Sequence, residues 1–471
     1  MPPAHAEAPN PRYVRLVPPD TTDRANVSSS TRGTEPEVPL RNLGGPSGTG
    51  LGAPAPGGFK HGMRAFRHRD FRLFFGGALV SNTGNWLQNL TVPFVLFELT
   101  QSAFWVGLAT FAQFIPAVVL GPLGGSLADR HRRRTVLLIS QTLMAVAAAA
   151  LWIAWAGGVR NPTAIVLITA TTGVFSGVMV PAWQAFVPSL VPREDLRSAI
   201  TLNSTQFNAA RAFGPALAGI LLATLGPSWA FLINTVSFVA VIAALWLIRP
   251  ATSVKAAAPA GGILRQFVEA LRYVRSQPGI WLGIVASVLV AALGNPVTQF
   301  TVVFAETVYQ AEARILGLLA AAIGIGAVVA APFLSAWEER ISRADAVRWG
   351  LPAYGVAITA FGLSGTWPIG FVALLFVGGG FLAVIASSNT AVQIIVADRM
   401  RGRVMATRVM AFTAAFPIGA LIQGWLIDLW GPRQTISAAG LLLTAIALGL
   451  ATRPGLLARL NDGPDQTEVG P

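Results

Sequence analysis

Cysteine is absent from this chain of 471 residues, and lysine nearly so, since Lys60 and Lys255 are the only two. Without a thiol, the chain has no disulfide framework, thiol nucleophile or sulfur-ligated metal site. Neither lysine stands in the G-x-x-x-x-G-K-S/T pattern that holds phosphates, and neither an H-E-x-x-H zinc motif nor a nucleophile elbow occurs. These absences argue against an enzyme or an ATP-driven pump, and they predict no metal and no cofactor.

Charged residues are also few, at 12% of the chain, whereas apolar residues reach 53% and the mean hydropathy is +0.58. Such a composition is too apolar for a soluble protein of this length. The net charge of +13 comes from basic residues spread over short loops between apolar runs, not from one basic polar domain. We therefore expect a protein of the lipid bilayer and no nucleic-acid partner.

Twelve apolar segments follow one another along the chain, and most reach the ~20 residues that cross ~30 Å of hydrocarbon as a helix. Backbone groups in lipid must bond internally, and the alternating ten-residue pattern of a membrane barrel is missing, so the predicted fold is an all-α integral membrane protein. The expected spans are 71–97, 103–127, 135–156, 163–187, 199–225, 229–248, 280–304, 315–337, 347–364, 369–392, 404–427 and 435–451.

Lysine and arginine are concentrated on one set of loops. That set, together with the five from Lys60 to Arg72 at the start of the first span, contains 24 of them, whereas the opposite loops contain three, Arg160, Arg314 and Arg433. Cytoplasmic loops carry the excess of Lys and Arg, so both termini are predicted to be cytoplasmic. The expected membrane is the inner, or plasma, membrane.

The longest internal connection, from Arg249 to Pro278, divides the spans six and six. Apolar residues recur in it at helical spacing from Ile263 to Val274, which predicts a short amphipathic helix at the cytoplasmic interface. The first 60 residues are rich in Pro, Gly and Ser and cannot bury a core, and the sequence leaves two starts open, Met1 and Met63. The predicted divisions are a disordered cytoplasmic tail over 1–62, a six-helix bundle over 63–250, a linker over 251–278, a second bundle over 279–453 and a cytoplasmic tail over 454–471.

The two groups of six spans repeat each other weakly. A shift of 210 residues places Gly107 on Gly317 and Asp129 on Glu339, and a shift of 205 places Gly219 on Gly424. Internal repetition of this kind is typical of transporters built from duplicated bundles.

One hairpin, between the second and third spans, has five charges in six residues and reads GPLGGSLADRHRRR from Gly121 to Arg134. It is similar to the G-x-L-A-D-R-x-G-R-R/K loop signature of the major facilitator superfamily, except that Arg132 replaces the second glycine. The resemblance implies a gate in which acid and bases bridge neighbouring helices in the outward-open state and separate in the inward-open one. Without the resemblance, the charges of this hairpin are explained as a signal that sets the orientation of the helices in the membrane. The gating residues so implied, with the degenerate copy in the second half, are Gly125, Asp129, Arg130, Arg133, Arg134, Glu339 and Arg340.

Two further stretches narrow the resemblance. Residues 187–221 and 396–406 look like the branch of this superfamily that contains the enterobactin exporter and related secretion-type effluxers. The resemblance implies two six-helix halves around a central cavity that opens to one side at a time. It also implies export of a small amphipathic, drug- or siderophore-like molecule, by antiport or another use of a proton or ion gradient.

Arg211 is predicted near the middle of the bilayer, because twelve residues separate it from the cytoplasmic edge near Ala199, or ~18 Å of helix. A charge there costs at least ~2.5 kcal/mol and should face a cavity or a partner. It either binds an electron-rich ligand or ties helices together. Gly214, Pro215 and Gly219, which follow it, form a partial version of the glycine-proline packing motif that resembles the fifth helix of effluxers.

Amide side chains recur on one face of several expected spans, at i, i+3 and i+7 or at i, i+4. They are candidates to line the cavity with Arg211, although amides also join helices by hydrogen bonds worth ~0.6 kcal/mol on average. The candidate lining residues are Asn82, Asn85, Asn89, Asn208, Asn295, Gln299, Asn389 and Gln393.

None of the 21 acidic residues falls in the middle of an expected span. If protons drive export, the carriers must therefore be Asp129, Glu306 or Asp428, which lie near span ends. Two alternatives stay open at this point, an uptake permease of the same fold and a non-transporting receptor. The expected partners are a small-molecule substrate and membrane lipids, and the expected state is a monomer.

Overall fold

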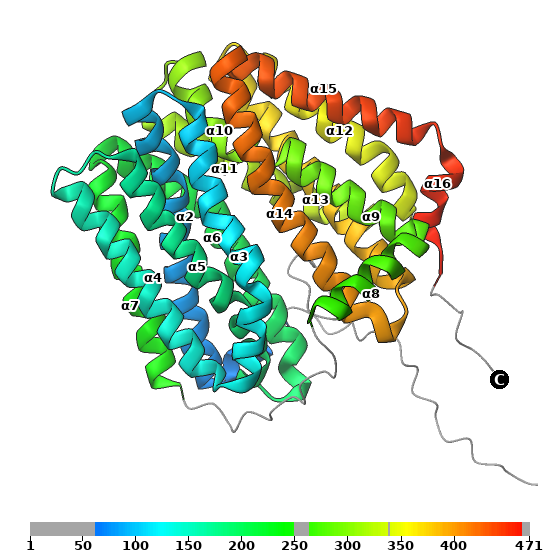
Figure 1. Cartoon of the computed structure of the whole chain (residues 1–471), viewed down its shortest axis with the longest axis horizontal. Helices are drawn as coiled ribbons and strands as arrows, with labels where there is room; N and C mark the ends of the chain where they lie inside the picture. Colours follow the sequence, from blue (N-terminus) through cyan, green and yellow to red (C-terminus); the bar gives the residue numbers. More distant parts are fainter. Residues whose placement is uncertain (1–61, 249–262, 338–339, 464–471) are drawn as a thin grey trace, which may run out of the picture. The chain divides into compact units, whose positions relative to one another are not determined.

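The computed structural model describes residues 62–248, 263–337 and 340–463. The described residues are nearly all helical and contain no strand. Figure 1 shows the helices in two groups, coloured blue to green for the first six spans and green to red for the rest. The first group consists of α2 (Arg69–Thr100), α3 (Ala103–Arg130), α4 (Arg133–Ala156), α5 (Pro162–Phe186), α6 (Leu196–Thr224) and α7 (Pro227–Leu247).

The second group begins with a span made of several pieces. This seventh span runs from α9 (Pro278–Leu289) through a π-helical turn, η4 (Val290–Gly294), to α10 (Val297–Val303) and a second π-helical turn, η5 (Phe304–Val308). The remaining spans of the group are α11 (Ala313–Trp337), α12 (Arg343–Leu363), α13 (Trp367–Ile395), α14 (Asp398–Trp430) and α15 (Pro432–Ala451).

Each of the twelve expected spans coincides with one of these helical stretches, so the predicted all-helical fold is confirmed. The helices extend up to six residues beyond the apolar windows, because backbone hydrogen bonding continues into polar flanks such as the first turn of α14 at Asp398. By length and composition, nine helices of the described residues are suited to cross a membrane. The other three, α2, α6 and α12, carry the polar residues that lower their hydropathy.

Short elements precede, connect or follow the spans at the end of the molecule that carries the basic loops. They are η1 (Arg64–Arg67), η2 (Val187–Leu190), η3 (Arg193–Asp195), α8 (Ile263–Ser276), α16 (Pro454–Ala458) and η6 (Arg459–Asn461). Helix α8 matches the amphipathic helix predicted for the linker, and its Ala270 and Val274 are buried. Its apolar face therefore packs on the protein.

The predicted repetition appears in the backbone as well as in the sequence. Gly226 and Gly431, which are 205 residues apart, both have positive φ, at 78° and 89°, and each is followed by a proline that starts the next helix. Only glycine adopts this conformation readily, and proline is favoured at the first helical position. Equivalent turns therefore lead into α7 and α15, the last span of each group.

Small residues let helices of the two groups approach closely. In the pair α6 and α11, a methyl group at Gly219 would lie 2.4 Å from the Cα of Gly317. In the pair α3 and α14, a methyl group at Gly107 would lie 2.5 Å from the carbonyl oxygen of Ala420. Since Gly107 and Gly317 are equivalent in the repeat, the two interfaces between the groups are themselves related.

Candidate functional site

The guanidinium of Arg211 lies between aromatic rings from both groups of helices. Its Cζ is 5.8 Å from the ring centroid of Trp86 on α2 and 5.2 Å from that of Phe381 on α13. Both distances are within the range of a cation–π contact. The side chain is half-buried, and Phe207, one turn earlier on α6, packs edge-on against the Trp86 ring at 6.2 Å. Arg211 thus faces protein from both halves.

A second arginine, Arg408 on α14, is 5% exposed. Its Nη1 donates to Oδ1 of Asn389 at 3.0 Å and its Nη2 to the carbonyl of Ile385 at 3.3 Å, both on α13. Its buried Nε has no hydrogen-bond partner in the described ranges, and no described carboxylate forms an ion pair with the group. Arg408 therefore holds a buried charge that neutral acceptors only partly satisfy.

Helix α13 contacts both arginines. The residues that contact them, Phe381, Ile385 and Asn389, follow at intervals of four and so lie along one face. Phe381 and Asn389 are eight residues, or about 12 Å, apart along α13. Phe412, one turn after Arg408, adds a ring 6.3 Å from Phe381. The rings of Trp86, Phe381 and Phe412, with Arg211 between the first two, thus extend from one half to the other.

The predicted amides divide into two groups. Those with hydrogen bonds inside their own half include Asn82, which donates to Gln206 at 3.2 Å, and Asn89, which accepts from Gln113 at 2.9 Å. Asn389 accepts from the buried arginine, and Asn208 donates to the carbonyl of Ser204 at 2.9 Å. The second group consists of four half-buried amides, Asn85, Asn295, Gln299 and Gln393.

The residues of the predicted glycine-proline motif lie where helices touch. A methyl group at Gly214 would lie 2.4 Å from Cβ of Trp86, and Gly219 meets α11 as described above. Pro215 is buried, and its carbonyl oxygen faces Gly317. All three thus lie at packed helix surfaces.

Asp428, near the end of α14, joins the two halves at the ends of the helices that lie away from the basic hairpins. Its Oδ1 accepts from the backbone N–H of Ala103 at 2.7 Å, and its Oδ2 accepts from the Ser102 hydroxyl at 2.5 Å and from the N–H of Phe104 at 3.2 Å. Ser102 is the N-cap residue of α3 but makes no capping bond with its own side chain. The carboxylate of one half thus caps a helix of the other.

The hairpin between α3 and α4 has a different arrangement. Asp129 and Arg130 are exposed, and Asp129 forms no ion pair within the described residues. Arg133 donates to the carbonyl of Ala185 at 3.0 Å, and Arg134 donates to that of Leu245 at 2.6 Å, so both bases bind helix ends within the first half. Gly125 has open space around its Cα, Arg340 of the second copy is exposed, and Glu339 lies outside the described residues.

Glu306 and Asp195 are two further acids with defined surroundings. Glu306 is half-buried on the π-helical turn η5. Asp195, just before α6, pairs with His68 at 2.8 Å and with Arg64 at 3.1 Å. The hydrogen bond from His68 is the main cause that lowers the pKa of Asp195, with the charge of Arg64 adding to it and burial opposing it.

Comparison with known proteins assigns this architecture to a family. The model of the transmembrane secretion effector family matches residues 61–460, which is most of the chain. The chain belongs to this family of the major facilitator superfamily. It is therefore a multi-pass membrane protein with a transporter fold.

The relatives of this chain include two transporters whose names state what they carry. An enterobactin exporter of Citrobacter koseri is 28% identical over 86% of this chain and 96% of its own length. A staphyloferrin A transporter of Staphylococcus aureus is 23% identical over 80% of this chain and 94% of its own. Among solved structures, an inward-facing bacterial homologue of the iron transporter ferroportin aligns with a TM-score of 0.63 at 18% identity, over 82% of this chain and 99% of that one.

Sequence reasoning missed Arg408 of this effector for a specific reason. The apolar window of its span begins at 404, so the arginine looked interfacial, but α14 begins at Asp398 and places it ten residues, or about 15 Å, into the helix. The aromatic row had no signal in the sequence, because Trp86, Phe381 and Phe412 come from separate helices and do not repeat at any spacing.

Proposed function

We propose that this secretion effector exports a small amphipathic anion, siderophore-like in character, by alternating access. The observation that carries the proposal is the pair of arginines, Arg211 and Arg408, which come from opposite halves and both contact helix α13. The two relatives named above, a staphyloferrin A transporter and an enterobactin exporter, support the substrate class, and the exporter supports the direction.

The charges of these two side chains explain why the substrate should be an anion. An arginine remains protonated in any protein environment, so its charge must be balanced by partners. Arg211 contacts two rings and Arg408 contacts an amide and a carbonyl, and no carboxylate of the described residues pairs with either. An anionic group on the ligand supplies the missing partner, while its apolar part stacks on Trp86, Phe381 and Phe412.

The surrounding half-buried amides fit a polar lining for such a ligand. Asn85, Asn295 and Gln299 make no side-chain hydrogen bond in the part of the chain that the structure describes, and each can donate to or accept from a substrate. We include them with Arg211 and Arg408 in the proposed cavity. Asn82 and Asn89 support this lining from behind through their bonds to Gln206 and Gln113.

The state of the two ends is consistent with a cavity that opens toward the hairpins. The contacts between halves through Asp428 and Gly107 lie toward the opposite end, whereas Asp129 is exposed and unpaired within the described residues. We propose that the hairpins are cytoplasmic, that both chain ends lie in the cytoplasm at the inner membrane, and that Asp129 and Arg130 close the cavity in the other state.

We further propose that a proton or ion gradient drives export and that the transporter works as a monomer. Glu306 is the preferred proton carrier because it is half-buried on the π-helical turn of the seventh span, and turns of this kind are frequent at functional sites. Asp129 and Asp428 are the other candidates. They are more exposed, which makes them suited to gating.

Transport by proteoliposomes tests the proposal. Vesicles with the full chain and an imposed pH gradient are offered enterobactin, staphyloferrin A or a cationic dye of similar size. We expect gradient-dependent transport of the anions and not of the dye. Replacing Arg211 or Arg408 with Gln removes an interaction with a charged group worth about 1.5–3 kcal/mol, so the apparent affinity should fall about ten- to a hundredfold.

Arg160→Gln is the matched control, because Arg160 also lies over an aromatic ring, at 3.8 Å from the centroid of Trp155, but far along the chain from the proposed cavity. It should transport as the wild type does. Equal transport of the cationic dye, or full activity of both Arg211→Gln and Arg408→Gln, would refute an anionic substrate. Transport that persists without any gradient would refute only the coupling.

A further inference from the structure

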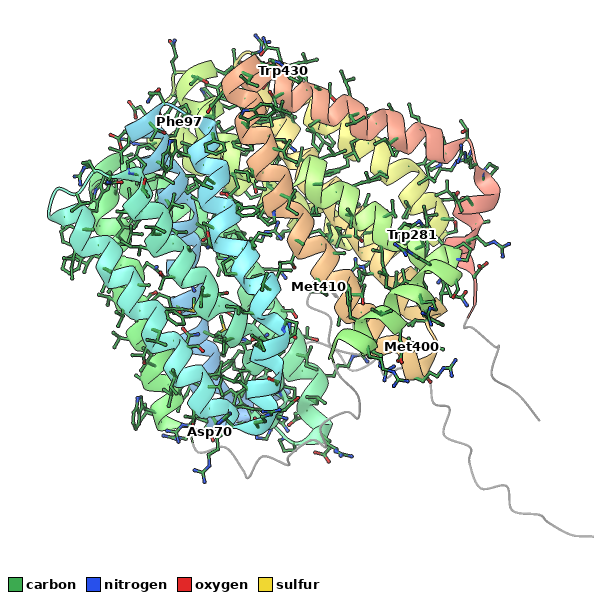
Figure 2. All side chains as sticks on the ribbon, in the orientation of Figure 1. Asp70, Phe97, Trp281, Met400, Met410 and Trp430 are labelled. Atoms are coloured by element: carbon green, nitrogen blue, oxygen red, sulfur yellow. The ribbon has the colours of Figure 1, made fainter. Side chains whose placement is uncertain are left out.

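An open depression of about 580 Å³ lies between helix α8 and the start of α14, apart from the proposed cavity. Figure 1 shows α8 beside the beginning of α14, where Figure 2 labels Met400. Three of the depression's seven lining residues are arginines. Its lining residues are Glu269, Arg272, Tyr273, Ser276, Arg399, Met400 and Arg403.

Helix α8 is held firmly in this place, so the face that it turns outward is fixed. Ala270 and Val274 are each 1% exposed, and Val274 belongs to an apolar core cluster formed mostly by the second half. The Tyr273 hydroxyl accepts a hydrogen bond from the backbone N–H of Ala397 at 3.1 Å, which attaches α8 to the residue before α14. The arginines of α8 are therefore directed away from the core.

The only carboxylate that lines this depression is already engaged. Oε2 of Glu269 accepts from Nη1 of Arg403 at 2.9 Å, and its Oε1 accepts from Nε of Arg265 at 3.0 Å. Arg272 is exposed and has no ion-pair or hydrogen-bond partner in the described part of the chain. The lining of the depression holds three arginines and one glutamate, which gives it a net positive charge suited to an anion.

We propose that this depression binds the phosphate headgroup of an anionic lipid. Guanidinium groups bind phosphate oxygens in a two-pronged geometry, and several of them converge here. The outward face of α8 also favours a lipid over free phosphate. Val268, which is 45% exposed, lies between Arg265 and Arg272 on that face and lines an adjoining depression of about 470 Å³ with them. An acyl chain can cover Val268 while the arginine heads hold the phosphate.

The position of α8 agrees with the presence of anionic lipids at the cytoplasmic surface of membranes. In the proposed orientation, α8 lies at the cytoplasmic surface, where anionic lipids give a negative potential that attracts basic segments. A lipid held here would connect α8 to α14, which carries the buried Arg408. The lipid site is nevertheless independent of the proposed substrate, because it stands on contacts outside the cavity.

Native mass spectrometry of the purified full chain in detergent tests the site. The probes are dioctanoyl-phosphatidylglycerol, dioctanoyl-phosphatidylcholine and inorganic phosphate, each titrated separately. We expect saturable binding of the phosphatidylglycerol, which the phosphatidylcholine does not match and millimolar inorganic phosphate does not displace. Each arginine near an anionic surface contributes about fivefold in affinity, so Arg272→Gln with Arg399→Gln should weaken binding about 25-fold.

Arg453→Gln is the matched control, because Arg453 is exposed at the same end of the second half and its loss changes the charge equally per residue. It should leave the affinity within twofold of the wild type. The proposal is overturned if the double variant binds phosphatidylglycerol as the wild type does, if Arg453→Gln weakens binding as much per charge, or if inorganic phosphate alone occupies the site. Melting temperatures without lipid confirm that the variants are folded.

Discussion

Removing the carboxylate of Asp428 should shift the transporter toward the state in which the basic hairpins approach each other. Three hydrogen bonds connect this side chain to the first turn of α3, across the two halves. A capped helix start is worth about 1 kcal/mol, within a range of about 0.5–2, and the negative charge on the helix dipole adds about 0.3–1 kcal/mol. Because Asp428 is exposed, water screens the charge, and we take about 1–2 kcal/mol for the whole joint.

This free energy predicts a graded series of variants. Asp428→Ala removes the cap and the charge and should change the ratio of the two states about 5- to 30-fold. Asp428→Asn keeps one acceptor, and Asn caps helices nearly as well as Asp, so it should lose only the charge effect and change the ratio about two- to fivefold. If Asp428 had only a local structural role, the two variants would not both shift the ratio in one direction, with Asp428→Ala shifting it more than Asp428→Asn.

The absence of cysteine makes the measurement clean, because two cysteines can be introduced into an otherwise unlabelled chain. Spin labels at His131→Cys and Ile341→Cys, both exposed, report the distance between the hairpins of the two halves by pulsed electron resonance. Loss of the joint at the opposite end should increase the population with the shorter distance.

Glu312→Ala is the control, since Glu312 is an exposed acid whose only described ion pair is a long one, 3.9 Å to Arg314. It should leave the distance distribution unchanged. If Asp428→Ala changes the ratio less than twofold, or if Glu312→Ala changes it equally, the joint does not hold the state and the reasoning fails.

Three other predictions concern separate parts of the molecule. Asp129→Asn should abolish turnover in proteoliposomes while the yield of inserted protein stays normal, and wild-type turnover would remove Asp129 from the gate. Gly219→Ala places a methyl group against the Cα of Gly317 and should destabilise the fold by about 1–3 kcal/mol in thermal unfolding. The pKa of Asp195 is lowered by His68, so its contribution to stability is complete above about pH 4 and is lost as the pH falls further; Asp195→Asn should flatten the melting temperature over that acidic range.

The helices themselves were predictable because each apolar run must satisfy its own backbone in lipid. The seventh span shows a feature that hydropathy does not predict. Hydropathy predicts one helix over 280–304, but two π-helical turns interrupt the observed span, the first just before Asn295 and Pro296. Proline lacks the N–H that continues a regular helix, so the Gly294-Asn295-Pro296 run was the available signal. The second turn, at Glu306, has no such signal.

A residue of the candidate site was predictable only where placing it in the membrane has a free-energy cost that the sequence alone reveals. Arg211 could be found because a charge deep in a span must face a partner. Which partners it has could not be found, because Trp86 and Phe381 are 125 and 170 residues away and only the packed helices bring them together. The role of Asp428 was out of reach for the same reason, since its bond to Ser102 joins residues that are 326 positions apart.

The two arginines and the joint at Asp428 favour opposite movements. Arg211 and Arg408 belong to different halves, so one anion that binds both stabilises the arrangement in which the halves close around it. The bonds of Asp428 stabilise only the state that is closed at the far end. A ligand can change this balance only by the difference in its affinity for the two states, and a joint worth about 1–2 kcal/mol requires about a 5- to 30-fold difference. A ligand that contacts both arginines in one state and only one of them in the other gains one charge-assisted contact. That contact is worth about 1.5–3 kcal/mol, which is sufficient. Substrates that carry two anionic groups should therefore be transported faster than those with one, even when both bind equally well to the open state.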